Sequence, residues 1–150
     1  MSVAVSSAEE GRLPPAGWAL GFENGEVGSS SALDERIRSG FSEAAARRFM
    51  EALEVKRDTA ARLLGVSTRT LARRLAEGRL KPAESDRLYR YAHLLERAAS
   101  VLGGAEATRT WLKEPQWGLG DRVPLSFAET EAGAREVEDL LGRIEHGVLA

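Results

Sequence analysis

The chain has 150 residues, which is enough for one domain or two very small ones. Its 21 basic and 23 acidic side chains give a formal net charge of −2, which excludes a histone-like basic protein and an acidic disordered tail protein. The absence of cysteine excludes disulfides, thiolate zinc sites and cysteine nucleophiles. No apolar run approaches the roughly 20 residues of a membrane span, and the N-terminus lacks the layout of a signal peptide, so we expect a cytoplasmic protein with no membrane partner.

The charges are unevenly distributed along the chain. The net charge is −3 over residues 1–40, +4 over residues 41–80, +1 over residues 81–120 and −4 over residues 121–150. A compact basic segment is consistent with a nucleic-acid interface, although a run of charges is more often a solvated face. The small total therefore hides a basic segment between acidic ones.

Residues 1–30 are rich in Gly, Ser, Pro, Ala and Glu and show no apolar period, which predicts a flexible N-terminal tail. Trp18, Leu20 and Phe22 alternate within it, as in a short extended segment that contacts a partner. A tail with isolated aromatic residues is the favoured interpretation. Order is expected to begin near Leu33, with one or two helical turns.

From Phe41 onward, the pattern predicts one helix after another. Apolar residues recur every four positions from Phe41 to Leu53, which indicates an amphipathic helix with Ser42 as its N-cap. A second, short helix stops at Gly65, and a third spans residues 68–77.

Pro82 suits the first turn of a longer helix that ends at Gly103. The apolar face of this helix is too broad for one narrow contact, so we interpret it as covering its own domain and also a second subunit. The candidate dimerisation residues on this face are Leu88, Tyr91, Leu95 and Leu102.

The last third of the chain predicts a short helix over residues 105–112, an ordered loop over residues 114–124 and a final helix whose apolar stripe ends at Ile144. Gly147 interrupts the final helix and leaves an apolar tip at residues 148–150. Alternating β-branched runs and Asn-Gly hairpin signals are missing from the ordered part of the sequence. We therefore predict an all-α fold.

Residues 58–75 carry the most specific local pattern. Ala61 is a small residue where a second helix would cross closely, Gly65 permits a tight turn with positive φ, and Val66 can anchor the corner. On the following helix, the leucines project to one side and the arginines to the other. This order predicts a helix-turn-helix.

Polar donors near the start of that second helix lie where helix-turn-helix proteins contact base edges, and the arginine fork suits guanine or phosphate. The alternative is a solvated, arginine-rich helix of a bundle, which we consider less well supported. The candidate DNA-binding residues are Ser67, Thr68, Arg69, Thr70, Arg73, Arg74 and Arg79, of which Arg74 and Arg79 are expected at phosphates. Because one such element neutralises few phosphates, we expect a homodimer.

Residues 70–75, 77–80 and 84–88 resemble the Xre/MbcA/ParS family of antitoxins. Further matches follow in order along the chain at Ala98, Gly103, Trp111-Leu112, Leu119-Gly120, Pro124-Leu125, Thr130, Gly133, Val137, Leu140, Ile144-Glu145 and Gly147. The order and spacing of these matches are specific, and the resemblance covers approximately residues 35–150.

Members of that family are antitoxins of RES-domain toxins, which consume or use NAD⁺. The resemblance implies a helix-turn-helix domain, placed at residues 31–80, and a dimerisation and toxin-binding domain at residues 81–150. It also implies that the chain binds operator DNA, represses its own operon and blocks the toxin's active site with its C-terminal end. The candidate toxin-binding residues are Trp111, Trp117, Leu119, Pro124, Leu125, Ile144, His146, Gly147, Val148, Leu149 and Ala150.

Several of these residues have an alternative, structural interpretation. Core packing is favoured for Trp111, whereas core and toxin interface are about equally supported for Trp117. For His146, stabilisation of a helix C-terminus is favoured over insertion into the toxin. The acids of the last helix suit a solvated face and a complement to a basic toxin surface equally well. They are Glu129, Glu131, Glu136, Glu138 and Asp139.

The sequence offers no nucleophile–base pair, Gly-rich phosphate loop or metal cluster, so we expect a non-catalytic protein without a cofactor or metal. The alternative function is a stand-alone transcriptional repressor whose C-terminal region only dimerises. The apolar tip at residues 148–150 disfavours that alternative.

Overall fold

The computed structural model describes residues 29–147, and within them the chain is helical, with isolated β-bridges but no strand. In chain order the elements are α2 (Ser30–Ser39), α3 (Glu43–Leu53), α4 (Arg57–Leu64), α5 (Thr68–Glu77), α6 (Pro82–Leu102), α7 (Ala105–Lys113), the 3₁₀ helix η2 (Trp117–Leu119), α8 (Pro124–Phe127) and α9 (Glu131–Glu145). The predicted all-α fold is confirmed. Within the described range, no helix combines the length and apolar character needed to cross a membrane.

The predicted flexible tail, residues 1–30, lies almost entirely outside the described residues, as do the aromatic positions noted within it. Helix α2 begins at Ser30, three residues before Leu33, and the Ser29 side chain caps it by accepting a hydrogen bond from the backbone N–H of Ala32 at 3.2 Å.

The helix ends lie where capping chemistry predicts them. Ser42 Oγ accepts from the backbone N–H of Ala45 at the start of α3, and Pro82 occupies the first turn of α6. Gly65 and Gly78 end α4 and α5 with φ of 75° and 89°, a left-handed conformation that costs glycine little. These local signals therefore position the helix-turn-helix segment.

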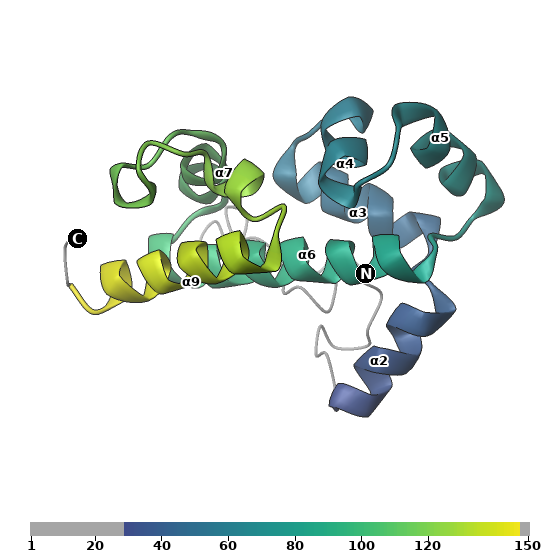
Figure 1. Cartoon of the computed structure of the whole chain (residues 1–150), viewed down its shortest axis with the longest axis horizontal. Helices are drawn as coiled ribbons and strands as arrows, with labels where there is room; N and C mark the ends of the chain where they lie inside the picture. Colours follow the sequence, from purple (N-terminus) through teal and green to yellow (C-terminus); the bar gives the residue numbers. More distant parts are fainter. Residues whose placement is uncertain (1–28, 148–150) are drawn as a thin grey trace, which may run out of the picture.

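The 21-residue helix α6 is the element on which the other helices pack (Figure 1). Helices α3, α4 and α5 lie over its N-terminal half, α2 projects from the opposite side, and α7 and α9 pack against its C-terminal half (Figure 1). Both halves of the chain therefore share one hydrophobic core along this helix.

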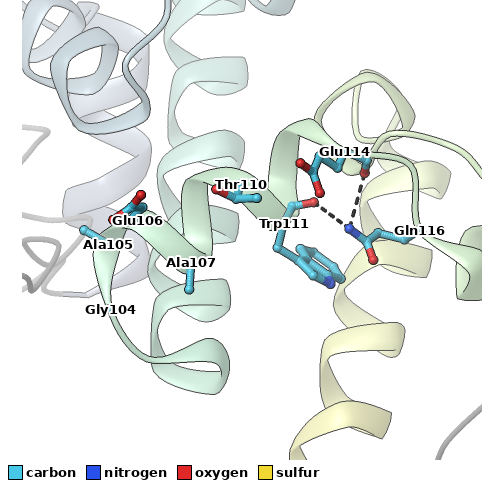
Figure 2. A pocket seen from close by; sticks show the side chains of 8 residues that line it. All are labelled: Gly104, Ala105, Glu106, Ala107, Thr110, Trp111, Glu114 and Gln116. Carbon is cyan, nitrogen blue, oxygen red and sulfur yellow. Dashed lines mark hydrogen bonds between the residues drawn. The ribbon is translucent and has the colours of Figure 1, made fainter.

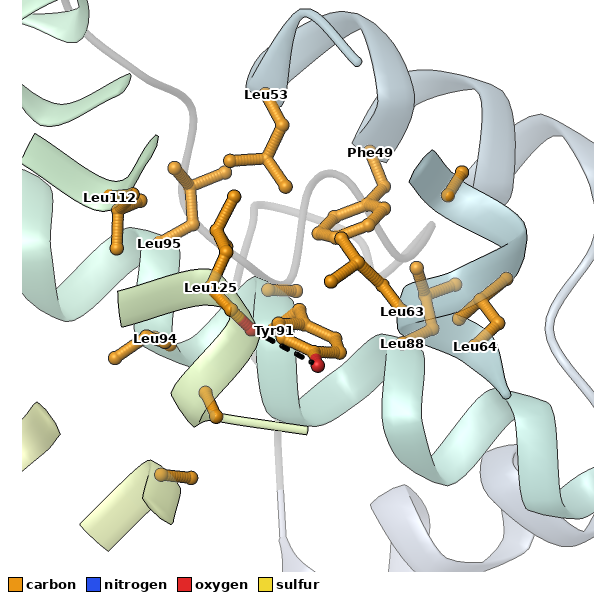
Figure 3. Packing of buried hydrophobic residues seen from close by; sticks show 14 of the residues in the cluster. Phe49, Leu53, Leu63, Leu64, Leu88, Tyr91, Leu94, Leu95, Leu112 and Leu125 are labelled. Atoms are coloured by element: carbon orange, nitrogen blue, oxygen red, sulfur yellow. Dashed lines mark hydrogen bonds between the residues drawn. The ribbon is translucent and has the colours of Figure 1, made fainter. Parts of the chain in front are cut away.

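Buried apolar side chains from both halves of the chain meet around Tyr91, in the middle of α6 (Figure 3). Its ring lies 6.2 Å from that of Phe49, centroid to centroid, and its hydroxyl donates a long hydrogen bond of 3.5 Å to the carbonyl of Leu125. Burial, reinforced by the carboxylate of Glu129, raises the pKa of the Tyr91 hydroxyl well above its usual value. Tyr91 thus joins the first half of the chain to the second as a neutral core residue.

The assignment of the α6 apolar face to dimerisation requires correction. Leu88, Tyr91 and Leu95 are at most 4% exposed, because helices from both halves of the same chain cover them. The apolar face is broad because it serves two sets of neighbours within one chain. Of the four predicted residues, Leu102, at the end of the helix, is the one that is half-buried and partly accessible.

Two cations of α7 bind the C-terminal end of α3. Arg109 donates to the carbonyl of Ala52 at 3.2 Å and lies 3.4 Å from the carboxylate of Glu54. Lys113 Nζ donates to the carbonyl of Glu54 at 3.0 Å. The last carbonyls of a helix have no hydrogen-bond partner within the helix and carry a partial negative charge. These contacts therefore provide the carbonyls at the end of α3 with hydrogen-bond donors, and they fix α7 against α3.

The predicted loop over residues 114–124 is ordered but not wholly irregular. It contains η2, and the backbone N–H of Gln116 donates to the carbonyl of Arg122 at 3.1 Å. The loop is followed by the four-residue helix α8, which the sequence pattern did not indicate because one turn is too short to show an apolar period.

Two glycines of α9 provide a matched test of the packing. A Cβ at Gly133 would lie 1.7 Å from the carbonyl oxygen of Phe127, whereas a Cβ at Gly142 would have no neighbour within 4 Å. We expect Gly133→Ala to destabilise the fold by about 2 kcal/mol or more. Gly142→Ala should instead stabilise it by up to about 1 kcal/mol, because alanine is the better helix former. Urea unfolding followed by circular dichroism checks both values, and equal effects would contradict the described approach of α8 to α9.

Candidate functional site

The turn between α4 and α5 has the geometry of a helix-turn-helix. The backbone N–H of Val66 donates to the carbonyl of Ala61 at 2.9 Å, which closes the turn around Gly65. A Cβ at Gly65 would lie 2.2 Å from the guanidinium of Arg87, a flexible side-chain end that can move aside, so the positive φ is what favours glycine here. Arg87 of α6 therefore lies directly against this turn.

Helix α5 has one buried and one solvent-exposed face. Leu71 and Leu75 are at most 4% exposed and fix the helix in the core. Thr68, Arg69 and Arg73 are exposed on the other face. Arg73 makes only a long, exposed ion pair of 3.9 Å with a glutamate of its own helix, so both arginine forks are accessible to a ligand. Donors on the first two turns of such a helix suit base edges and phosphates.

Ser67 and Thr70 have a structural role at the start of α5. Ser67 Oγ accepts from the backbone N–H of Thr70 at 3.0 Å and is hydrogen-bonded to the Thr70 hydroxyl, also at 3.0 Å. Ser67 is exposed and Thr70 is half-buried, so their hydroxyls remain at the rim of the arginine face. The cap orders the first turn, on which Thr68 and Arg69 stand.

The assignment of Arg74 to DNA phosphates is wrong for this structure. Its side chain is 13% exposed, and its Nε lies 3.0 Å from Oε1 of Glu84, whose side chain is 8% exposed. The same Glu84 oxygen accepts from the backbone N–H of Lys81 at 3.0 Å and caps α6. Arg74 projects towards the start of α6 rather than onto the arginine face, and the buried carboxylate neutralises it.

Arg79 is exposed but is also used within the fold. Its guanidinium donates to the carbonyls of Ser39 and Gly40 at 3.1 and 2.8 Å. These bonds hold the end of α2 against the chain that follows α5, where the backbone N–H of Leu80 donates to the carbonyl of Phe41 at 2.9 Å. The donors of Arg79 that point to the two carbonyls are not available to DNA.

The adjacent arginines Arg73 and Arg74 should therefore differ sharply in their contribution to stability. We expect Arg74→Ala to cost about 3 kcal/mol, because it leaves the buried Glu84 carboxylate without its cation. Arg73→Ala should change the free energy of unfolding by less than about 0.5 kcal/mol, because its ion pair is exposed. Chemical denaturation measures both, and an Arg74→Ala variant as stable as the parent would refute the structural role.

A second surface lies on α7 and the loop after it. Trp117 is 76% exposed, and Trp111 is half-buried at the side of an open groove of about 770 Å³ (Figure 2). Gly104, Ala105, Glu106, Ala107, Thr110, Glu114 and Gln116 complete the lining of this groove. The two tryptophans thus occupy different environments, and only Trp117 projects freely into solvent.

Three residues predicted to contact a toxin are core residues instead. Leu119 and Leu125 are 5% exposed and Pro124 is fully buried, so their side chains cannot reach a partner without unfolding. They pack the loop and α8 against α7 and α9. Their apolar character therefore reflects the core of the second half of the chain.

The C-terminal end of α9 is more accessible. Ile144 is half-buried against the core, and His146 and Gly147 are exposed. The backbone N–H of His146 donates to the carbonyl of Gly142 at 3.1 Å, so His146 stands at the end of the helix, as its alternative interpretation requires. The remaining predicted contact residues, Val148, Leu149 and Ala150, lie outside the described residues.

Some of these predicted acids are paired within the fold. Glu129, which precedes α9, lies 3.5 Å from Arg62 of α4, and Glu131 is 2.8 Å from Arg135. Glu138 lies 3.5 Å from the imidazole of His93, which is not a permanent cation. Glu136 and Asp139 remain exposed, without an ion pair in the described part of the chain. In that same part no three His, Cys, Asp or Glu side chains converge as they would around a metal ion.

Comparison with known proteins finds a family model that matches each half of the chain. Residues 32–93 match the family model of the antitoxin Xre-like helix-turn-helix domain, and residues 97–147 match that of the antitoxin Xre/MbcA/ParS C-terminal toxin-binding domain. The first of these ranges includes most of α2 and the N-terminal half of α6. The matched helix-turn-helix domain is therefore larger than the helix-turn-helix itself, which is α4 and α5.

Individual relatives agree with these domain matches. Antitoxin Xre of Yersinia enterocolitica is 44% identical over 91 residues, which is 59% of this chain and 62% of that protein. Antitoxin Xre of Photorhabdus laumondii is 35% identical over 91 residues, and that of Pseudomonas putida is 34% identical over 83 residues. These alignments span 62% and 52% of the two proteins, so the chain covers less than two thirds of each relative.

One solved structure has the same fold. A chain from the crystal structure of the M. tuberculosis MbcT–MbcA toxin–antitoxin complex superposes with a TM-score of 0.57 at 20% identity, over 72% of this chain and 96% of that one. The two domains of the Xre/MbcA/ParS antitoxins thus follow one another in this sequence, and the chain belongs to that family.

Proposed function

We propose that this chain is the antitoxin of a toxin–antitoxin pair, and that its partner is a RES-domain toxin that consumes NAD⁺. The observation that carries the proposal is the match of residues 97–147 to a toxin-binding domain, directly after a helix-turn-helix domain of the same family. The family resemblance of the sequence supplies the class of toxin. The chain itself acts by binding and performs no catalysis.

Inhibition works by obstruction of the toxin's active site. The exposed end of α9, with His146 and Gly147, leads into the apolar residues 148–150. An apolar segment of this kind can enter a pocket and occupy the space that a substrate needs. Ile144 packs the end of α9 against the core of the antitoxin.

The chain also binds operator DNA through α5 and represses its own operon from within the cytoplasm. Arg69 and Arg73 contact bases or phosphates, with Thr68 beside them. A homodimer places two such helices on two half-sites and doubles the number of phosphates neutralised. Its interface uses surface residues such as Leu102, since the other leucines proposed for it are in the core.

Removal of residues 147–150 tests the obstruction mechanism. We expect the truncated chain to lose protection of cells that express the RES-domain protein encoded beside it, because the end of α9 no longer reaches the active site. The fold should persist, because a Cβ at Gly147 would have no neighbour within 4 Å and its backbone N–H makes one hydrogen bond, at 3.2 Å to the carbonyl of Ile144. Growth rescue measures protection, and circular dichroism confirms folding. Full protection by the truncated chain would contradict the mechanism.

Single substitutions on α5 test DNA binding. Arg69→Ala and Arg73→Ala should each weaken binding to the DNA upstream of the chain's gene by about tenfold, as expected for loss of one good arginine contact. Arg135→Ala is the matched control, because it removes the same charge from an exposed site on α9, with 73% of the side chain accessible. Fluorescence anisotropy gives the dissociation constants. Equal weakening by all three variants would indicate a non-specific charge effect instead.

A further inference from the structure

Trp117 is the one large apolar side chain of the described residues that is mostly exposed, with 76% of its surface accessible. An indole in water forfeits the free energy that its burial would provide, so such an exposure is unfavourable for the isolated chain. Tryptophan is also among the side chains that contribute most to binding when a partner buries them. The exposure therefore points to a contact surface.

The backbone holds Trp117 in a fixed position. Gln116, the preceding residue, accepts at its carbonyl from the N–H groups of Leu119 and Asp121 at 3.0 Å each. Its side-chain amide donates to the carbonyls of Trp111 and Glu114 at 3.0 and 3.3 Å, as Figure 2 shows. These bonds close the loop into η2 and tie it to the end of α7.

The loop that carries Trp117 packs against α9. A Cβ at Gly118 would lie 2.6 Å from Cδ1 of Leu140, so the backbone next to Trp117 is pressed against a core leucine of α9. A side chain presented on such a rigid base loses little conformational freedom when a partner binds it. Trp117 is thus preorganised for contact.

Cations and carboxylates both lie near Trp117. Arg109 pairs with the carboxylate of Glu54. Lys113, which donates to the carbonyl of Glu54, and Arg122, which lies 4.7 Å over the ring of Phe127, are exposed and keep their charge. The carboxylates of three exposed residues on this surface make no ion pair within the described part of the chain. They are Glu106, Glu114 and Asp121.

The groove beside Trp117 extends the same surface. It is lined by the half-buried Trp111 with Ala105 and Ala107, and Glu106 and Glu114 stand at its rim. Gln116 lines the groove and is the chain neighbour of Trp117, so the backbone that carries the exposed indole adjoins the groove. We call the groove and Trp117 together the tryptophan surface, and the exposed carboxylates of Glu106 and Glu114 lie along the groove.

We propose that the tryptophan surface is the primary docking site for the toxin, separate from the end of α9 that obstructs its active site. This inference rests on the proposed function. The occupant is a face of the toxin that has an apolar pocket for the indole and lysine or arginine side chains around it. Docking at the tryptophan surface supplies most of the affinity, and it delivers the end of α9 to the active site.

The test compares variants of the full chain for binding to the RES-domain protein encoded beside it, by calorimetry, and for inhibition of NAD⁺ consumption at saturating antitoxin. Trp117→Ala should weaken binding by about tenfold or more. Inhibition at saturation should remain complete, because the end of α9 is intact. Trp117→Phe should recover part of the affinity. The triple variant Glu106→Gln, Glu114→Gln and Asp121→Asn should weaken binding and reduce the dependence of the affinity on salt.

The controls separate this proposal from folding and from the proposed function. Trp117→Ala should unfold at the parent's temperature, since its side chain is mostly exposed, and Arg135→Ala should bind the toxin like the parent. If the parent chain does not bind the RES-domain protein, the proposed function itself fails. If the parent binds and Trp117→Ala binds equally well, the docking site is wrong while the proposed function stands.

Discussion

The shared core along α6 is the constraint on which the rest of the structure depends. Its apolar side chains meet α3 and α4 at one end and α7, α8 and α9 at the other, so that neither half of the chain has a complete core without it. Tyr91 contacts Phe49 from one half and Leu125 from the other. Because α6 is a single helix with no break, the arginine face of α5 and the tryptophan surface are held in one fixed relative orientation. A partner bound at one surface therefore keeps a defined position relative to a ligand at the other.

Polar contacts strengthen the same arrangement at its edges. Ser85 of α6 accepts from the backbone N–H of Phe41 at 2.9 Å, and Glu84 beside it binds Arg74 of α5. Several residues that carry the family resemblance are thus fold-determining: Arg74 and Glu84 form a buried pair, and Gly133 allows α9 to approach α8. The resemblance identified the fold through these structural residues, and the residues that contact ligands have to be found from exposure.

This distinction explains which predictions succeeded. Helix limits depend on local chemistry, such as the Ser42 cap and the left-handed glycines at 65 and 78, and the sequence specifies them well. Burial depends on distant segments: Leu119 looks like a contact residue on a polar loop, yet α9 covers it. The same reason separates Arg73 from Arg74, which are neighbours in sequence but lie on opposite sides of the boundary between solvent and core. Periodicity gave the direction of the leucines correctly but contained no information about Glu84.

The net charge of −2 also acquires a structural meaning. The basic segment at residues 41–80 is less available for DNA than its charge of +4 indicates, because Arg62 and Arg74 pair with carboxylates and Arg79 binds backbone carbonyls. The acidic C-terminal segment is reduced in the same way, since Glu131 pairs with Arg135 and Glu129 with Arg62. Internal pairing therefore reduces the accessible charge of both segments, and the exposed arginines of α5 are among the charges that remain accessible. A small accessible charge on each surface also limits non-specific attraction, so that shape and a few well-placed groups must provide the affinity.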